Sequence, residues 1–386
     1  MGEGGLTFRP AWAEVDLDAL AHNLAVLGAR ADPAVVCAVV KADGYGHGAV
    51  PVARASLDAG AAWLAVALVE EGVALREAGI EAPVLLLSEA PPEAAEEVLA
   101  RDLTPTVYSL EAVEALARAA RARGRTGLAV HLKVDTGMHR VGIPPDGAVA
   151  VAEAVLARPE LALGALWSHF AVADEPDRDF TDGQARRFDE VVARLGARGI
   201  RAPLHHLCNS AGVLAHERCH RDLVRCGIAL YGVAPSRRLE GTADLRPVLR
   251  LAARVTSCRR VTAGEGISYG LNYRPARPAT VATVPLGYAD GVPWALARGG
   301  EVLVRGVRRP IAGNVTMDQL MVDCGDDPVA VGEEVVLLGR QGAEEVTAWE
   351  WAERGGTIAY EVLTGLGARV PRRLVATGLH AGGRRP

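Results

Sequence analysis

The fold of this chain is decided by one stretch, Val35-Val36-Cys37-Ala38-Val39-Val40-Lys41-Ala42-Asp43-Gly44-Tyr45-Gly46-His47-Gly48. Its first half is an apolar run rich in β-branched residues, which is typical of a fully buried strand. The alternating glycines that follow indicate a tight loop whose backbone can approach a ligand closely. Lys41 is therefore predicted to lie at the carboxyl end of a buried strand, facing whatever occupies that loop.

The chain contains only two lysines, Lys41 and Lys133, among 42 Lys and Arg residues, so the other 40 are arginines. A guanidinium group keeps its proton near neutral pH, whereas a buried amine can lose its proton and become nucleophilic. Position and this bias together make Lys41 a candidate for amine chemistry. For Lys133, a surface position explains the residue equally well.

The composition limits the class of protein. With 386 residues, 49% hydrophobic and 23% charged, the chain has room for two globular domains. The net charge of −5 comes with no basic cluster, which argues against a nucleic-acid or membrane partner. No apolar run reaches the ~18 residues of a membrane span, and Met1–Gly5 lacks the features of a signal peptide. The six cysteines show no metal-binding spacing, so we expect reduced thiols, a cytoplasmic protein and no metal site.

From Ala34 to about Leu230, short apolar runs alternate with amphipathic segments. The runs cover residues 34–40, 63–69, 84–87, 105–108, 129–134, 162–167, 204–208 and 223–226. Helices are predicted near 17–30, with Asp16 as the cap, and over 91–100, 110–123 and 180–196. Eight strands alternating with helices predict an α/β fold, a (β/α)8 TIM-type barrel over residues 12–245. A doubly wound sheet is the alternative, but it would need fewer strands and usually a phosphate fingerprint after the first.

Polar residues stand at the ends of five of these predicted strands. They are Lys41 at the first, Lys133 and Asp135 at the fifth, His169 at the sixth, Asn209 and Ser210 at the seventh, and Arg225 at the eighth. In a barrel all these strand ends lie on one face, where active sites form. The loops after strands 7 and 8 often bind a phosphate, and here they offer the Ser210 hydroxyl and the backbone N–H groups of Gly227 and Ile228.

From about Arg246 the helical periodicity fades, and short strands appear between glycine and proline turns. This pattern predicts a mainly-β domain over residues 246–378, which residues 1–11 are expected to join. Strands are expected over 250–257, 281–285, 302–305, 321–324 and 335–338. Thr347 and Glu350 form a capping-box pattern before a helix, and a second helix is expected near 359–366. Arg372, Arg373 and the Gly-rich tail from Ala376 are expected to be frayed.

A lysine that can lose its proton beside a phosphate site, with no redox or metal motif, indicates Schiff-base chemistry. Two alternatives fit: permanent attachment of pyridoxal 5′-phosphate, or capture of a carbonyl substrate as in an aldolase.

The chain resembles the alanine racemase family along nearly its whole length. The matching motifs, in chain order, are Val40–Gly48, Leu132–Met138 with Arg140, Trp167–Phe170, Cys208–Ser210, Arg225–Ile228 with Tyr231-Gly232, Ser268–Gly270, Gly287–Gly291, Met317-Asp318 and Tyr360-Glu361. Nine motifs in order across two domains make the resemblance specific, whereas each motif alone is weak.

The resemblance implies a role for each matching residue. Lys41 would bind pyridoxal 5′-phosphate as the internal aldimine and act as base for D-alanine, and Tyr269 would act as base for L-alanine from the opposite face. The cofactor phosphate would be surrounded by Tyr45, Asn209, Ser210, Gly227, Ile228 and Tyr360. Arg225 would donate to the pyridine nitrogen, with His169 between Arg225 and Tyr269. Arg140 would contact both the cofactor and the substrate. Met317 would contact the substrate carboxylate, and Tyr288 would line the entry corridor.

The resemblance also implies a head-to-tail homodimer in which the β domain of one subunit covers the barrel mouth of the other. In this family the residue at Lys133 is often carbamylated and braces Arg140. The activity implied is racemisation of alanine, supplying D-alanine for peptidoglycan. Two departures affect loop shape at most: His139 stands where many relatives have glycine, and Thr316 where many have cysteine.

The chemistry of racemisation agrees with these roles. A proton must leave one face of the α-carbon and return on the other, so two bases on opposite faces are needed. Tyrosine has an ordinary pKa of ~10, so a cationic relay such as His169 with Arg225 must stabilise its phenolate. Three alternatives remain open: a racemase of broader substrate range, a pyridoxal phosphate-dependent decarboxylase of similar fold, and a cofactor-carrying regulatory protein built on the same barrel.

Overall fold

The computed structural model describes residues 8–376, and it divides into two compact units. One unit comprises residues 20–44 and 49–246, and the described parts of the other are residues 8–19, 45–48 and 247–376. We expected the first domain to begin at residue 12, but residues 11–16 pair with strands of the second unit. Met1–Gly5 and the tail beyond Ala376, on which we also based expectations, lie outside the described residues.

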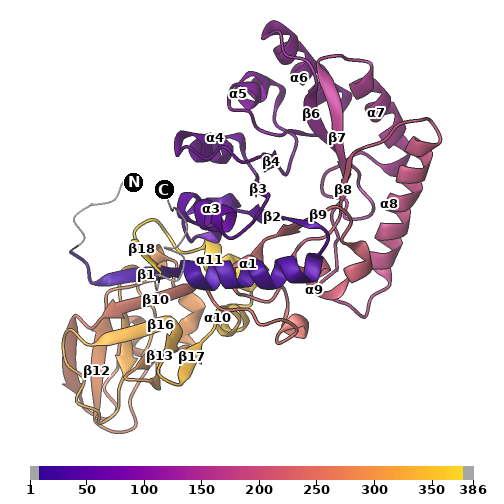
Figure 1. The fold of residues 1–386 in the computed structure, drawn as a ribbon. Helices are drawn as coiled ribbons and strands as arrows, with labels where there is room; N and C mark the ends of the chain where they lie inside the picture. Colours follow the sequence, from indigo (N-terminus) through magenta and orange to yellow (C-terminus); the bar gives the residue numbers. More distant parts are fainter. Residues whose placement is uncertain (1–7, 377–386) are drawn as a thin grey trace, which may run out of the picture. The chain divides into compact units, whose positions relative to one another are not determined.

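The first unit is built on eight parallel strands. They are β2 (Val35–Val39), β3 (Trp63–Val66), β4 (Val84–Leu86), β5 (Thr106–Val107), β6 (Leu128–Lys133), β7 (Leu161–Trp167), β8 (Leu204–His206) and β9 (Leu223–Cys226). They form two runs, β9-β2-β3-β4 and β5-β6-β7-β8. Leu85 bridges to Thr104 at one junction, and the N–H of Arg225 donates to the Cys208 carbonyl over 2.9 Å at the other. The strands therefore close into the predicted (β/α)8 barrel (Figure 1).

Helices alternate with these strands. The α-helices are α1 (Leu17–Ala31), α3 (Ala49–Asp58), α4 (Val69–Glu77), α5 (Ala95–Ala100), α6 (Leu110–Ala122), α7 (Ala148–Leu156), α8 (Phe180–Gly196) and α9 (Ser210–Ala215). Short 3₁₀ helices are η1 (Pro92–Ala94), η2 (Pro145–Gly147), η3 (Glu217–Cys219), η4 (Ile228–Tyr231) and η5 (Arg237–Leu239). Asp16 caps α1 as predicted, because its Oδ1 accepts from the Ala19 N–H over 2.9 Å. Leu20, Leu24 and Leu27 are buried, each contributing ~1.5–3 kcal/mol.

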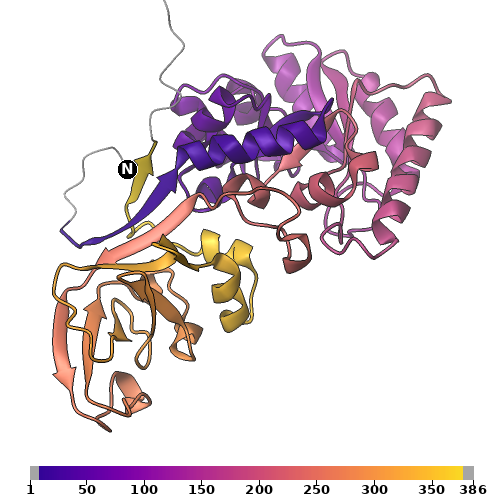
Figure 2. The same ribbon diagram turned by 60° about the horizontal axis from the view of Figure 1, so that its bottom comes forward.

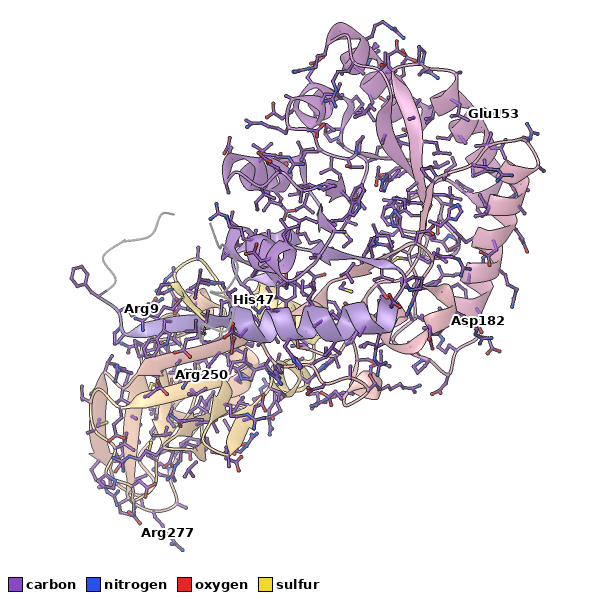
Figure 3. All side chains as sticks on the ribbon, in the orientation of Figure 1. Arg9, His47, Glu153, Asp182, Arg250 and Arg277 are labelled. Atoms are coloured by element: carbon purple, nitrogen blue, oxygen red, sulfur yellow. The ribbon has the colours of Figure 1, made fainter. Side chains whose placement is uncertain are left out.

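The second unit is mainly β, as predicted. Its larger sheet runs β14-β13-β16-β10-β1-β18, and β17 pairs with β16. The members are β1 (Ala11–Asp16), β10 (Leu249–Arg254), β13 (Glu301–Val304), β14 (Val307–Pro310), β16 (Glu334–Gln341), β17 (Glu344–Val346) and β18 (Arg372–Val375). A smaller sheet orders β11 (Ser257–Val261), β12 (Ala279–Val284) and β15 (Leu320–Asp323). Arg250 on β10, labelled in Figure 3, donates to Glu14 over 2.9 Å and to Glu334 and so links three neighbouring strands.

The chain's first and last described strands lie side by side in this sheet. β1 pairs antiparallel with β10 and parallel with β18, with Ala13 opposite Arg372 (Figure 2). The expectation that Arg372 and Arg373 are frayed is therefore wrong: both lie in β18, whose backbone is hydrogen-bonded to β1. The apolar alternation that predicts strands is absent there, because only an edge of β18 contacts the sheet.

Two helices complete the second unit, α10 (Ala348–Gly355) and α11 (Ala359–Thr364), with 3₁₀ turns η6 (Tyr269–Leu271), η7 (Tyr288–Asp290) and η8 (Trp294–Ala297). Thr347 caps α10, since its Oγ1 accepts from the Glu350 N–H over 3.1 Å. Within residues 8–376, no helix combines the length and the apolar character that crossing a bilayer requires.

Candidate active site

Lys41 lies two residues beyond the end of β2, and the chain continues from it through a left-handed turn (labelled α2, Lys41–Tyr45). Residues 42–45 have φ values of 51°, 52°, 60° and 52°. A left-handed conformation costs an ordinary residue ~1–2 kcal/mol, and only one of these four is glycine. The Gly44 N–H donates to the Val40 carbonyl and Asp43 Oδ1 accepts from the Ala49 N–H, both over 2.9 Å. Such bonds offset the strain and fix the backbone beyond Lys41.

The amine of Lys41 is biased toward its uncharged form. Burial lowers its pKa, and so does the positive charge of Arg140, while Glu71 acts in the opposite direction. An uncharged amine is the form that attacks a carbonyl and accepts a proton.

Arg225 on β9 is 2% exposed and lies among neutral partners. Its Nη2 donates to the carbonyls of Ser168 and Leu207 over 2.9 and 2.8 Å, and its carbon Cζ lies 4.6 Å from the centre of the Trp167 ring. Burial lowers its pKa to about 10, so the guanidinium stays charged at neutral pH. These bonds do not use the Nε–H, which remains for a further acceptor.

His169 accepts a hydrogen bond from this guanidinium. Arg225 Nη2 lies 3.3 Å from His169 Nδ1, and burial together with the charge of Arg225 holds the pKa of His169 well below its ordinary value. Because a guanidinium has only donors, Nδ1 must be the acceptor, and the proton of the neutral ring sits on Nε2.

Two buried histidines that we did not predict extend this network. Arg225 Nη1 lies 2.6 Å from His206 Nδ1, and His206 Nε2 lies 3.2 Å from His131 Nδ1. Burial, followed by the charge of Arg225, lowers the pKa of His131 to about 3 and that of His206 well below normal. His206 is therefore the neutral acceptor toward Arg225, and its Nε2–H donates in turn to Nδ1 of the neutral His131 ring. The sequence signal was available, since His131 interrupts an apolar run and His206 ends a strand between Leu204 and Leu207.

Lys133 ends β6 and is 3% exposed, so the surface position that we left open is excluded. Its Nζ donates to the Leu87 carbonyl over 3.3 Å and lies 4.1 Å from the centre of the Trp167 ring. Burial, with the charges of Arg225, Arg140 and Lys41, lowers its pKa to about 7.

The loop after β6 is organised by Asp135. Its Oδ1 accepts from the N–H groups of Gly137, Met138 and His139 over 2.9, 3.0 and 3.0 Å, and its Oδ2 lies 3.1 Å from His139 Nδ1. His139 has a φ of 55°, a left-handed value that favours glycine. Arg140, which follows, is exposed at the end of this loop.

The loops after β8 and β9 meet at Ser210. Its buried Oγ accepts from the N–H groups of Gly227 and Ala229 over 2.9 and 3.3 Å, so its own O–H proton remains to donate to an anion. Asn209 Oδ1 caps α9 by accepting from Gly212, which leaves its NH₂ group as a donor. Ile228 opens η4, so its N–H has no partner inside that helix.

The remaining predicted phosphate ligands belong to the second unit. Tyr45 and Tyr360 have ring centres 6.4 Å apart, and burial raises the pKa of Tyr45 to about 12. Gly46 lies so close to α11 that a Cβ would come within 2.4 Å of the Leu363 carbonyl oxygen. Arg372, which we expected to be frayed, donates to the Gly46 carbonyl over 2.9 Å. It is a residue that sequence reasoning missed, and it anchors the loop that carries Tyr45.

Tyr269, Tyr288 and Met317 lie in turns of the second unit and are 76%, 46% and 53% exposed. The carbonyl of Tyr269 accepts from Asn314 Nδ2 over 2.8 Å. The Met317 carbonyl accepts from the N–H that follows Tyr288 over 3.0 Å, so these two turns are held together. The close approach requires Gly287, where a Cβ would lie 2.4 Å from the Met317 oxygen.

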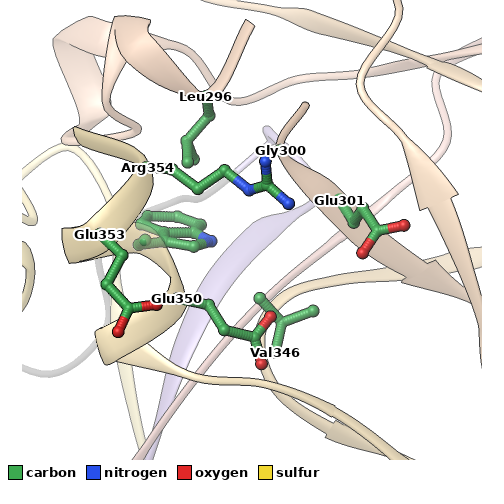
Figure 4. A pocket seen from close by; sticks show the side chains of 8 residues that line it. Leu296, Gly300, Glu301, Val346, Glu350, Glu353 and Arg354 are labelled. Atoms are coloured by element: carbon green, nitrogen blue, oxygen red, sulfur yellow. The ribbon is translucent and has the colours of Figure 1, made fainter. Parts of the chain in front are cut away.

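A pocket of about 300 Å³ in the second unit contains none of the predicted site residues (Figure 4). It is lined by Trp351, Arg354 and Leu296 together with three glutamates. Two of those carboxylates, Glu301 and Glu350, bind Arg308, which offsets part of the pocket's negative charge.

The residues of the barrel fit pyridoxal 5′-phosphate. Lys41 offers an amine with a lowered pKa, Ser210 an uncommitted hydroxyl proton, and Arg225 a donor that cannot give up its proton to a ring nitrogen. These are the three contacts that an aldehyde, a phosphate and a pyridine ring require.

Comparison with known proteins gives the same assignment. The family description "Alanine racemase, N-terminal domain" matches residues 15–235, and "Alanine racemase, C-terminal domain" matches residues 248–374. The alanine racemase of Symbiobacterium thermophilum is 46% identical over 365 residues, covering 94% of this chain and 97% of the relative.

Solved structures agree over the full chain. The alanine racemase of the D-cycloserine-producing Streptomyces lavendulae has a TM-score of 0.91 and 41% identity, covering 96% of this chain and 98% of its own. A histidine racemase from Leuconostoc mesenteroides has a TM-score of 0.87 and 29% identity, covering 96% and 99%. Since both family descriptions and the full-length relatives match, and the barrel residues fit the cofactor, the chain belongs to the alanine racemase family of pyridoxal phosphate-dependent isomerases.

Proposed function

We propose that this chain carries out its family's reaction, the interconversion of L-alanine and D-alanine, with Lys41 and Tyr269 as the two bases. The observation that carries the proposal is the lowered pKa of Lys41 at the end of β2, beside the charge of Arg140. When bound, pyridoxal 5′-phosphate supplies an electron-withdrawing ring that makes the α-hydrogen of the amino acid acidic. The bases supply the stereochemistry.

Lys41 and Tyr269 act on opposite faces of the α-carbon. Lys41 as a neutral amine takes the proton from D-alanine and returns it there, while Tyr269 does the same for L-alanine. His169 carries its proton on Nε2 because Arg225 donates to Nδ1, so it can donate onward to the phenol oxygen. The charge of Arg225 then stabilises the phenolate form through this ring.

The other predicted site residues would hold the cofactor and the substrate. Ser210, Asn209 and the N–H of Ile228 would hold the phosphate, with Tyr45 and Tyr360. Arg225 would donate to the pyridine nitrogen and, being unable to release its proton, keep that nitrogen unprotonated. Arg140, braced by Lys133, and the N–H of Met317 would receive the substrate carboxylate, and Tyr288 would line the entrance.

Racemisation of both enantiomers tests the function. Purified chain with added cofactor should abolish the optical rotation of either L- or D-alanine, and Lys41→Ala should lose both activity and the visible absorbance of the lysine-bound cofactor. No turnover of either enantiomer by the cofactor-loaded wild-type chain contradicts the proposal.

We further propose that the active form is a homodimer with shared sites. Tyr269, Tyr288 and Met317 together expose apolar and aromatic surface, which favours burial by a second copy. Co-expression of Lys41→Ala and Tyr269→Phe chains distinguishes the arrangements. In a shared-site dimer, random pairing restores about a quarter of the wild-type sites, because half the dimers are mixed and each has one intact site. Sites formed within one chain restore none.

The substrate range is tested separately, because a histidine racemase shares this fold. We expect the highest kcat/KM for alanine in a panel that includes serine and histidine. The six reduced cysteines favour a cytoplasmic location, where D-alanine would enter peptidoglycan synthesis.

A further inference from the structure

Glu71, the third residue of α4, accepts hydrogen bonds from backbone N–H groups of two neighbouring barrel loops. Its Oε1 accepts from the N–H of Ala42 over 2.6 Å. Its Oε2 accepts from the N–H groups of Ala67 and Leu68 over 2.8 and 3.1 Å. One carboxylate therefore joins the loop after β3 to the turn that follows Lys41.

The bond to Ala42 acts on a residue with a strained, left-handed backbone conformation. Ala42 has a φ of 51°, and it is the first of the left-handed residues after Lys41. A carboxylate accepting from a backbone N–H makes a charge-assisted bond, which is stronger than a bond between neutral groups. Without that bond, Ala42 would relax toward an ordinary negative φ and change the direction in which the Lys41 backbone leaves the strand.

We propose that Glu71 is a positioning residue for Lys41, holding Ala42 in the left-handed turn so that the lysine side chain keeps its direction at the end of β2. The inference rests on the proposed role of Lys41. It adds a residue that touches neither substrate nor cofactor and acts only through the backbone of Ala42 and through its charge.

The competing explanation is that Glu71 only caps helix α4. The two roles can be distinguished because each uses a different carboxylate oxygen. Capping α4 needs only Oε2, whereas the bond to Ala42 uses Oε1. Glu71→Asp keeps the charge and a carboxylate at the start of the helix but shortens the side chain by one methylene, out of reach of Ala42. Glu71→Gln keeps the length and removes the charge. The matched control is Glu70→Gln, an exposed neighbour in the same helical turn.

Three measurements on the full chain give the outcome. Hydrogen exchange at the Ala42 amide should accelerate by about tenfold or more in Glu71→Asp and Glu71→Gln. Capture of added pyridoxal 5′-phosphate by cofactor-stripped chain and kcat should each fall by about tenfold or more, because misplacement of about 1 Å costs up to ~100-fold. NMR of the two lysine side chains should show the Lys41 titration midpoint moving down in Glu71→Gln, since the Glu71 charge raises that pKa.

Each outcome decides the matter. Exchange at Ala42 and cofactor capture equal to those of Glu70→Gln overturn the proposal. So does failure of both Glu71 variants to fold, because the residue is then purely structural. Exchange at Ala42 is measured without turnover, so it stands even if the wild-type chain does not racemise alanine, which would contradict the proposed function instead.

Discussion

The Nζ atom of Lys133 lies 4.1 Å from the centre of the Trp167 ring, and the same ring receives the Arg225 guanidinium at 4.6 Å. Two cationic side chains thus share one buried indole. Burial and the neighbouring positive charges lower the pKa of Lys133 to about 7, so around neutral pH its charge is partly lost and its repulsion with Arg225 is reduced.

The first prediction is that Lys133 reacts with carbon dioxide. Around pH 7 about half of its amine is uncharged, so it can attack carbon dioxide, forming a carbamate and releasing one proton. The negative carbamate would pair with Arg140. Carbon-13 NMR in labelled bicarbonate should show a carbamate signal above pH 7 that fades below pH 6 and is absent in Lys133→Arg. A signal that persists in Lys133→Arg places the modification elsewhere.

The second prediction follows the α-hydrogen. In Tyr269→Phe, racemisation should fall by ~10²–10⁴-fold, because one of the two bases is lost. Proton NMR in heavy water should still show exchange of the α-hydrogen of D-alanine, through Lys41, but much slower exchange in L-alanine. The enantiomers have equal free energy, so kcat/KM must remain equal in the two directions. Equal exchange of both enantiomers would reject the assignment of Tyr269.

The third prediction concerns Arg372, which donates to the carbonyls of Gly46, Leu366, Gly367 and Val370. Arg372→Gln should lower the free energy of unfolding by about 2–4 kcal/mol, because several partly buried carbonyls lose their donor. It should also weaken cofactor affinity, since Gly46 adjoins Tyr45.

The control for this prediction is Arg373→Gln, which removes only an exposed arginine whose Cζ lies 4.4 Å from the ring centre of Trp12. Urea denaturation and cofactor titration measure both variants. Equal effects of the two substitutions would show that the carbonyl contacts of Arg372 contribute little.

The fourth prediction separates strain from hydrogen bonding at His139. Its left-handed φ costs about 1 kcal/mol, which glycine would relieve and alanine would not. His139→Ala should therefore be less stable than His139→Gly, as urea midpoints will show. Both variants lose the contact of the ring with Asp135 and should raise KM for alanine, because Arg140 follows directly. If the two variants are equally stable, the φ at this position is not the source of strain.

The strands of the barrel could be predicted from sequence, whereas several edge strands of the second unit could not. Apolar runs located all eight strands, and Asp16 and Thr347 were identified as caps because capping depends on neighbouring residues alone. Strands β11, β14, β17 and β18 escaped prediction, because short, polar edge strands depend on partners far away in the chain.

The roles of Glu71 and Arg372 were not predicted from the sequence, for a related reason. Both act on backbone groups of residues distant in sequence, and those groups carry no signature in the side-chain pattern. The histidines His131 and His206 were visible in the sequence as polar residues within the runs that predict strands. Their shared bond network became meaningful only once the closed barrel brought β6, β8 and β9 around Arg225.

The position of β1 between β10 and β18 has a consequence for synthesis on the ribosome. Once translation has passed Cys226, all eight barrel strands have been synthesised. The barrel can therefore close while translation continues. The larger sheet must wait, with an exposed edge on its first-made strand, until the final strand emerges almost 360 residues later. Stalled or prematurely terminated chains will therefore present an unpaired strand edge to proteases and chaperones.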